Sequence, residues 1–207
     1  MESSKVTIAT LGSHSALQIL KGAKDEGFKT ALVCLKSRLK LYSRFKKLMD
    51  EIVLVESFSE VISQEVQEKL SNLNAILVPH GSLVEYVSLE QIENNFKIPI
   101  FGNKYILRWE SDRNLKEKLL REAGVRTPKA YSSVDEVDST VIVKLPGAKG
   151  GKGYFLATNP EEIREKLRVL NIREEDIFVQ EYILGTTAYV HFFYSPLSDE
   201  LEIISMD

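Results

Sequence analysis

The sequence predicts an α/β fold in which a doubly wound parallel sheet in residues 1–101 precedes an α+β domain in residues 102–207. In the first part, short runs of β-branched residues alternate with amphipathic helical segments, a pattern typical of a parallel sheet with helices on both faces. In the second part, strand segments joined by turns indicate antiparallel hairpins. Because the pattern changes near Gly102, we place the domain boundary there.

The composition indicates a globular protein with neither a membrane segment nor a general nucleic-acid-binding surface. The 207 residues are 43% hydrophobic and 28% charged, which supplies ample core for one or two domains. The net charge of −3 argues against a basic nucleic-acid-binding face, and no apolar run is long enough to span a bilayer. The lone cysteine, Cys34, lies in an apolar strand segment and is expected to be a small buried hydrophobe. With no signal-peptide pattern at the start, a cytoplasmic location is expected.

The elements of the first domain follow from residue type and local caps. Gly27 is placed as the stop of the first helix, Ser59 as the cap of the second, and Ser88 opens a capping box with Gln91 at the start of the third. Strands are expected at 6–10, 30–35, 52–55, 75–78 and 97–101, and helices at 16–26, at 60–70 and from residue 88.

Two loops of the first domain carry side chains suited to ligand binding. Gly12-Ser-His14 follows the first strand, and Pro79-His-Gly-Ser82 follows the fourth. Open parallel sheets bind ligands beyond the carboxyl ends of their strands, where the strand order reverses. If the first and fourth strands are neighbours there, the loops meet over one crevice. A single histidine in such a place is usually structural, but two such loops favour a ligand site.

The segment 36–47 contains six lysine or arginine residues. A solvated helix or loop surface is the more common meaning of such a run. The alternative is a surface that guides an anionic substrate.

The second domain begins with a helix that is capped by residues 111–114 and ended by Gly124 and Pro128. A further helix starts at Asn159-Pro160, with acidic residues in its first turn, and runs to about Leu170. Strands are expected at 141–144, 154–157, 178–183, 187–194 and 201–205.

A glycine-rich basic loop joins the strands at 141–144 and 154–157. Glycine lets backbone amides turn toward an anion and lysine supplies a point charge, so the loop is suited to covering a polyphosphate. It is neither a Walker A loop nor a Rossmann fingerprint, because it lacks G-x-x-x-x-G-K-[ST] and no helix follows. A solvated hairpin turn is the alternative. The residues concerned are Gly147, Gly150, Gly151 and Gly153, with Lys144, Lys149 and Lys152 in or beside them.

The order of these motifs resembles the ATP-grasp superfamily, preceded by its small α/β (pre-ATP-grasp) domain. The capped helix, the strand with Lys144, the glycine loop, a helix and the segment 178–185 follow one another as they do in that superfamily. The resemblance implies that ATP is held between two subdomains, with the lysine on its phosphates, the glycines closing over them and the later strand presenting backbone groups to adenine. An ordinary exposed strand pair is the alternative for that later strand. The residues that this assigns to ATP are Lys144, Gly150, Gly151, Gly153, Gln180, Glu181 and Ile183.

A closer resemblance, to the archaeal-type formate-dependent FAICAR synthetases, covers essentially the whole sequence. It implies an ATP-dependent ligase of purine (IMP) biosynthesis that uses ATP, Mg²⁺ and formate to formylate the ribonucleotide AICAR through formyl phosphate. His14 and Ser82 would bind AICAR, and a homo-oligomer is suggested. The motifs that carry this resemblance lie at 10–15, 78–82, 101–103, 107–111, 143–154, 190–196 and 205–207.

The end of the sequence departs from this family, whose members are longer. The late acidic residues fit turns and surfaces better than a metal site, so no metal ligand and no catalytic residue is assigned. We therefore expect an incomplete ATP-grasp domain, truncated at its C-terminus, with the Mg²⁺ ligands beyond the end of this chain. The alternatives to an active ligase are a non-catalytic nucleotide-binding module and an inactive fragment whose last strands lack partners.

Overall fold

The protein is described by a computed structural model that covers residues 5–146 and 153–207. Two of the residues assigned to ATP, Gly150 and Gly151, lie outside the described residues. The contacts within the chain divide it into two units, Met1–Val125 and Arg126–Asp207, each with its own sheet. This grouping places residues 102–125 with the first unit, and the domain boundary expected after residue 101 stays a prediction.

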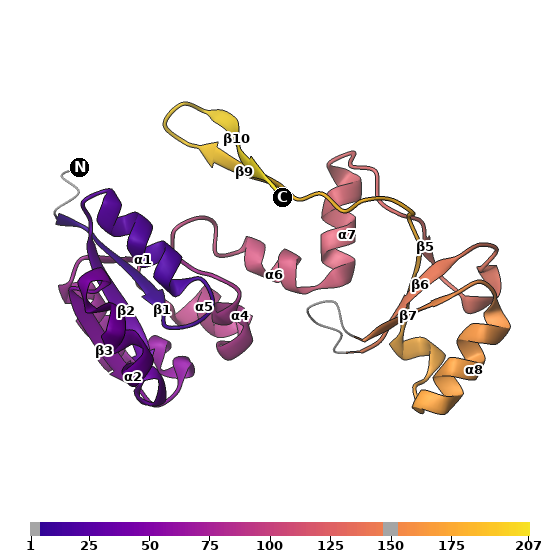
Figure 1. Ribbon diagram of the computed structural model, residues 1–207, viewed down its shortest axis with the longest axis horizontal. Helices are drawn as coiled ribbons and strands as arrows, with labels where there is room; N and C mark the ends of the chain where they lie inside the picture. Colours follow the sequence, from indigo (N-terminus) through magenta and orange to yellow (C-terminus); the bar gives the residue numbers. More distant parts are fainter. Residues whose placement is uncertain (1–4, 147–152) are drawn as a thin grey trace. The chain divides into compact units, whose positions relative to one another are not determined.

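The first unit is built on a four-stranded parallel sheet in the order β3-β2-β1-β4 (Figure 1). β1 pairs in parallel with both β2 and β4, so the strand order reverses between β1 and β4. Ile100 adds an isolated parallel bridge to Leu77, where the sequence predicts a fifth strand. The strands are β1 (Thr7–Leu11), β2 (Lys29–Leu35), β3 (Glu51–Val55) and β4 (Ala75–Leu77).

Helices connect these strands, and most of their predicted ends agree with the structure. Gly27 has φ +77° just after the first helix, as expected for a helix stop. The prediction that Ser59 caps a single long helix was wrong, because Ser63 has extended backbone and splits the segment in two. Ser57 caps the first piece and Ser63 the second. The helices are α1 (Ala16–Asp25), α2 (Leu39–Tyr42), α3 (Gln64–Asn72), α4 (Ser82–Tyr86), α5 (Leu89–Asn95), α6 (Ile106–Ser111) and α7 (Arg113–Glu122), with 3-10 helices η2 (Lys36–Arg38), η3 (Ser43–Leu48) and η4 (Phe58–Ile62).

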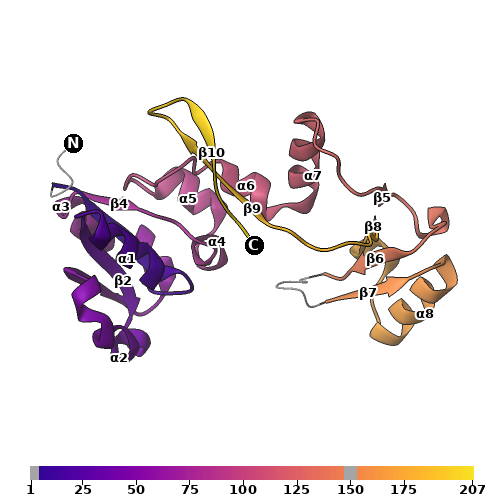
Figure 2. The ribbon, with the colours of Figure 1, turned by 45° about the horizontal axis from the view of Figure 1, so that its top comes forward.

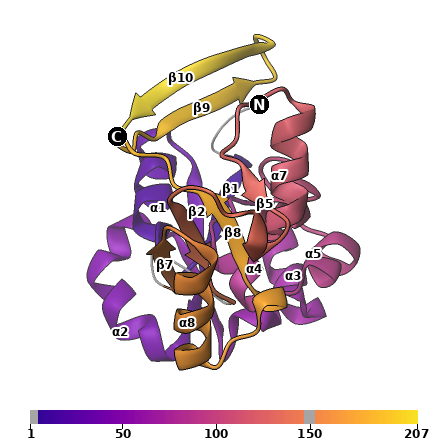
Figure 3. The same ribbon diagram turned by 90° about the vertical axis from the view of Figure 1, so that its right-hand side faces the viewer.

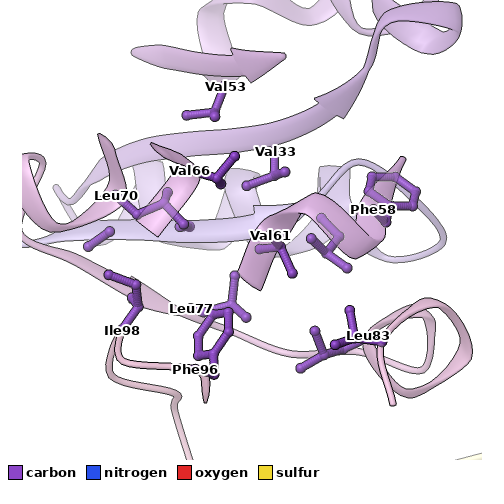
Figure 4. Packing of buried hydrophobic residues seen from close by; sticks show 14 of the residues in the cluster. Val33, Val53, Phe58, Val61, Val66, Leu70, Leu77, Leu83, Phe96 and Ile98 are labelled. Carbon is purple, nitrogen blue, oxygen red and sulfur yellow. The ribbon is translucent and has the colours of Figure 1, made fainter. Parts of the chain in front are cut away.

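The side chains of β2 divide between two cores, one on each face of the sheet. Ala31 and Val33 pack in the larger core, with η4, α3 and α5 (Figure 4). Leu32 and Cys34 pack in the smaller core, under α1 and Tyr42. Because successive side chains of a strand point to opposite faces, helices on both faces cover them all. The predicted doubly wound sheet and the buried cysteine are therefore confirmed.

The second unit holds a four-stranded antiparallel sheet in the order β5-β8-β6-β7, with α8 along one face (Figure 3). Val143 and Val179 pack against Ile163 and Leu167 of the helix. The cap predicted at Asn159 is present: its Oδ1 accepts a hydrogen bond of 2.9 Å from the Glu162 amide. The elements are β5 (Ala130–Tyr131), β6 (Val141–Lys144), β7 (Tyr154–Ala157), α8 (Pro160–Leu170) and β8 (Phe178–Glu181), with 3-10 helices η5 (Val134–Glu136) and η6 (Glu174–Asp176).

A separate two-stranded hairpin ends the chain (Figure 2). It consists of β9 (Val190–Ser195) and β10 (Glu200–Met206), close to the strands expected there. Large apolar side chains stand exposed along both strands; Phe192 is 56% exposed and Ile203 68%. In the part of the chain that the structure describes, no helix has the length and apolar character needed to cross a membrane.

Candidate functional site

The loops that follow β1 and β4 meet, as the sequence predicts for neighbouring strands at the reversal of strand order. His14 Nδ1 lies 2.9 Å from Ser82 Oγ and 3.2 Å from Ser13 Oγ. The two hydroxyl-bearing residues are buried, at 6% exposure for Ser13 and 0% for Ser82. The ring centroids of His14 and His80 are 6.3 Å apart. The loops thus place two imidazoles and two hydroxyls at one edge of the sheet.

His80 links the two loops and acts as a structural residue. Its Nε2 lies 3.0 Å from the carbonyl oxygen of Leu11, which can only accept, so Nε2 carries a proton and donates. Nδ1 then accepts from the backbone amide of Ser82 at 3.4 Å, as expected for a neutral ring. These two bonds fix the start of α4 against the end of β1.

His14 has the features of a ligand-facing residue. It is exposed and has φ +30°, in the left-handed region that non-glycine residues seldom adopt. Such conformations cost about 1–3 kcal/mol and gather at functional sites. Its Nδ1 faces the two serine hydroxyls, whereas Nε2 has no hydrogen-bond partner within residues 5–146 and 153–207. The second ring nitrogen is therefore available to a ligand.

Gly12 brings the first loop close to the neighbouring strand. Its amide donates to the Val33 carbonyl at 2.8 Å. A Cβ atom here would lie 3.1 Å from Cε2 of Tyr42 and 3.3 Å from the Val33 carbonyl oxygen. Since both contacts are tighter than ordinary packing, glycine at residue 12 lets the loop take this path without displacing Tyr42 or the Val33 carbonyl.

Arg38 adds a positive charge to the same edge. It ends η2, just after β2, and its Nη1 donates to the Gly12 carbonyl at 3.0 Å. The guanidinium carbon lies 5.5 Å from the centroid of the Phe58 ring, within the range of a cation–π contact. No carboxylate of the described residues lies within ion-pair distance of this half-buried side chain. We call Ser13, His14, Arg38, His80 and Ser82 the strand-end cluster.

Arg38 does not stand out in the sequence, because the six cations of segment 36–47 look alike there. The surface interpretation suits Lys36, which is exposed and pairs with Glu56. Arg38 differs by its place three residues after the end of the strand predicted at 30–35. That strand lies beside the first one, and this adjacency was the available signal.

On the second sheet, Lys144 and Gln180 lie together on the face that α8 leaves uncovered. In the register of β6 and β8, Lys144 is opposite Phe178 and Ile142 is opposite Gln180. Lys144 Nζ donates to Gln180 Oε1 at 2.8 Å and lies 5.6 Å from the centroid of the Phe178 ring. These contacts hold the ammonium group in place as a point charge suited to phosphate.

The other residues assigned to ATP differ in what they can offer. Glu181 is used within the sheet: its amide donates to the Lys129 carbonyl at 2.8 Å, and its Oε2 accepts from the Lys129 amide at 3.0 Å. Ile183 follows β8, and within the described ranges its amide has no hydrogen-bond partner. Gly153 has φ +77°, and its carbonyl accepts from the Leu145 amide at 2.8 Å, which closes the base of the glycine loop.

The described residues do not form a metal site. Across residues 5–146 and 153–207, no three His, Cys, Asp or Glu side chains converge to hold an ion. Mg²⁺ therefore has no assigned ligand here.

The chain resembles known proteins over most of its length. Residues 8–131, more than half of the chain, match a family described as "Protein of unknown function (DUF1246)", and residues 159–207 match a "Domain of unknown function (DUF1297)". The 5-formaminoimidazole-4-carboxamide-1-(beta)-D-ribofuranosyl 5'-monophosphate synthetase of Methanocaldococcus jannaschii is 52% identical over 98% of this chain and 58% of its own length. This chain thus spans somewhat more than half of that relative.

Two solved structures share the fold. The crystal structure of an IMP biosynthesis protein PurP from Thermococcus kodakaraensis has a TM-score of 0.71 at 32% identity, over 96% of this chain and 58% of that one. The N5-carboxyaminoimidazole synthetase from Staphylococcus aureus, complexed with ADP, has a TM-score of 0.69 at 16% identity, over 97% and 53%. These likenesses confirm the predicted ATP-grasp type of α/β fold and the resemblance to FAICAR synthetases. The chain belongs to the DUF1246 family.

Proposed function

We propose that this chain supplies the AICAR-binding and ATP-binding elements of a ligase that formylates AICAR to FAICAR, with ATP and formate, in purine (IMP) biosynthesis. The observation that carries the proposal is the 52% identity, over 98% of the chain, to a relative with that synthetase name. The chemistry of two sites supports it independently, because one suits a nucleotide monophosphate and the other a polyphosphate.

The strand-end cluster is the proposed AICAR site. His14 would use Nε2, and Ser82 its hydroxyl, to bind the ribonucleotide. The contact of 2.9 Å between His14 Nδ1 and Ser82 Oγ orients both groups before the ligand arrives. A site ordered in advance loses less side-chain freedom when it binds.

The open face of the second sheet is the proposed ATP site. Lys144, held by Gln180, would contact the phosphates, and Gly150, Gly151 and Gly153 would cover them. The Ile183 amide would meet the adenine edge, with Gln180 and Glu181 beside it at the hinge. Mg²⁺ would accompany ATP, but because the described residues do not fit a metal site, no step is assigned to it.

The proposed reaction has two steps. A formate oxygen attacks the γ-phosphorus of ATP, the bond to ADP breaks, and formyl phosphate forms. The amine nitrogen of AICAR then attacks the formyl carbon, phosphate leaves with the electrons of the C–O bond, and the nitrogen loses a proton. Phosphorylation is needed because formate alone lacks a leaving group, and lysine stabilises the charge on the transferring phosphoryl group.

The test is phosphate release measured with ATP, formate and AICAR together and with each omitted. Release that requires all three supports the ligase. Calorimetry with AICAR and with a non-hydrolysable ATP analogue tests binding separately. Binding without turnover would instead assign this chain to a non-catalytic nucleotide-binding module, and no binding of either ligand would indicate an inactive fragment. The resemblance also suggests a homo-oligomer. This stays a prediction, which sedimentation velocity would test.

A further inference from the structure

The charged member of the strand-end cluster, Arg38, has no contact with AICAR assigned to it in the site proposed so far. It reaches the cluster from β2, the strand on the other side of β1 from β4. The carboxyl ends of three neighbouring strands therefore contribute to one edge: His14 from the loop after β1, Arg38 after β2, and Ser82 after β4.

The contacts of Arg38 fix its position but do not neutralise its charge. A guanidinium group has five N–H donors, and the Gly12 carbonyl takes one, from Nη1, at 3.0 Å. Within the described ranges no carboxylate pairs with it. Burial raises the pKa of the Cys34 thiol and of the Tyr42 hydroxyl, which keeps these two neighbours uncharged at neutral pH. A half-buried cation held in this way is matched best by an anion that arrives from outside.

The groups at this edge of the sheet match a phosphate monoester. The cluster offers His14 Nε2 as a hydrogen-bonding group, its serine hydroxyls hold the His14 ring from the Nδ1 side, and it contains no acidic side chain. A phosphate dianion presents several acceptor oxygens, and the planar fork of arginine pairs with two of them at once. A lone carboxylate such as formate would leave most of these donors unused.

We propose that Arg38 binds the 5'-phosphate of the ribonucleotide in the strand-end cluster. This inference rests on the proposed function, since it names the group that anchors the same ligand. The ribose and base would then extend from the phosphate past His14 and Ser82.

The experiment compares two ligands that differ only in the phosphate: AICAR and the corresponding ribonucleoside. Their affinities are measured by calorimetry in the intact protein, for wild type, Arg38→Gln and Arg38→Lys. Arg44→Gln is the matched control, because it removes the same charge from the same basic segment at an exposed position. Thermal unfolding of each variant verifies that it folds.

The expected result is that Arg38→Gln weakens AICAR binding about 10- to 100-fold, the effect of losing hydrogen bonds to a charged group. Binding of the ribonucleoside should change little. Arg38→Lys should fall between, because it keeps the charge and loses the fork. Arg44→Gln should alter neither affinity. In wild type, inorganic phosphate should compete with AICAR and leave ribonucleoside binding unaffected, a readout that needs no variant.

Four outcomes would overturn the proposal. Equal weakening of both ligands in Arg38→Gln would make Arg38 a purely structural residue. A raised KM for formate with unchanged AICAR affinity would assign Arg38 to formate. If wild type binds AICAR more tightly than the ribonucleoside and Arg38→Gln shows the same preference, Arg38 does not bind the phosphate. The proposed function would then still stand. Wild type that binds neither ligand would remove both.

Discussion

His14 Nδ1 lies 2.9 Å from Ser82 Oγ, although the two residues are 68 positions apart in the sequence. The contact exists because β1 and β4 are adjacent, so their following loops emerge at the same edge. His80 reinforces it by bonding the Leu11 carbonyl from the second loop. The candidate site is thus a direct product of strand order.

His14→Ala should weaken AICAR binding about 10-fold or more and leave ATP-analogue binding nearly unchanged, because it removes one hydrogen-bonding group of the site. Calorimetry with each ligand measures this. His80→Ala should differ, lowering thermal stability as well, since His80 joins the two loops. Unchanged AICAR affinity in His14→Ala would exclude the histidine from the site.

His14→Gly should be more stable than His14→Ala by about 1 kcal/mol, because glycine adopts a positive φ without strain. The observed φ is +30°. Denaturant unfolding of the two variants gives the difference directly. Equal stabilities would show that the backbone at residue 14 stores no strain.

Lys144→Ala should weaken binding of the ATP analogue by about 10-fold or more while AICAR binding stays the same. Lys166→Ala is the matched control. Lys166 also lies over a phenylalanine ring, 5.0 Å from the centroid of Phe155, but it comes from α8. A similar loss in both variants would point to general electrostatics rather than to a site on the open face of the sheet.

Gly12→Ala should destabilise the protein by about 1–3 kcal/mol, because the added methyl group meets the Tyr42 ring and the Val33 carbonyl. Gly22→Ala is its control. Gly22 lies within α1, where an added Cβ would meet nothing within 4 Å, so alanine should stabilise the helix by about 0.5–1 kcal/mol. Chemical denaturation should show that the free energy of unfolding falls in Gly12→Ala and rises in Gly22→Ala. An unchanged free energy of unfolding in Gly12→Ala would contradict the close approach.

Asp50 should make the folding stability of the protein depend on pH in the acidic range. Burial acts to raise its pKa, but hydrogen bonds from Lys24 and from the Thr30 amide and hydroxyl together hold the pKa below its ordinary value of 3.8. A carboxyl group whose pKa is lower in the folded state stabilises the fold above its unfolded pKa and loses that contribution as pH falls through the folded pKa.

Asp50→Asn should therefore lower Tm at about pH 7, and the gap from wild type should shrink below about pH 4. Thermal unfolding at several pH values measures it. Asp25→Asn is the comparison, since among the described residues the one ion pair of Asp25 is with Lys21 at the surface. A gap that stays constant down to about pH 2 would contradict the lowered pKa.

Helices and strands whose ends are set by neighbouring residues in the sequence were predicted correctly. The strands at 141–144 and 154–157 and the helix from Pro160 to Leu170 match the structure residue for residue, since a β-branched run and the Asn159 cap define their ends. The split at Ser63 was missed because serine is a plausible cap at positions 57, 59 and 63 alike. Which serine is used depends on how Phe58 and Val61 reach the core.

The site was predictable where it depends on strand order and not where it depends on contacts distant in sequence. Two polar loops after parallel strands were enough to place His14 near Ser82. The role of Arg38 depends on Gly12 and Phe58, and the engagement of Glu181 depends on Lys129, fifty-two positions away. No short pattern in the sequence records those pairings.

The second sheet has one face sealed by α8 and one left open, so the same two strands carry two sets of side chains with separate duties. The side chains at positions 141, 143 and 179 pack in the core under α8. Those at positions 142, 144, 178 and 180 lie on the opposite face. If the proposed ATP site lies on the open face, libraries that vary only the latter set should change which nucleoside triphosphate is preferred and leave the packed face intact. Because successive side chains of a β-strand point to opposite faces, residues that determine ligand preference can change without altering the residues that stabilise the fold.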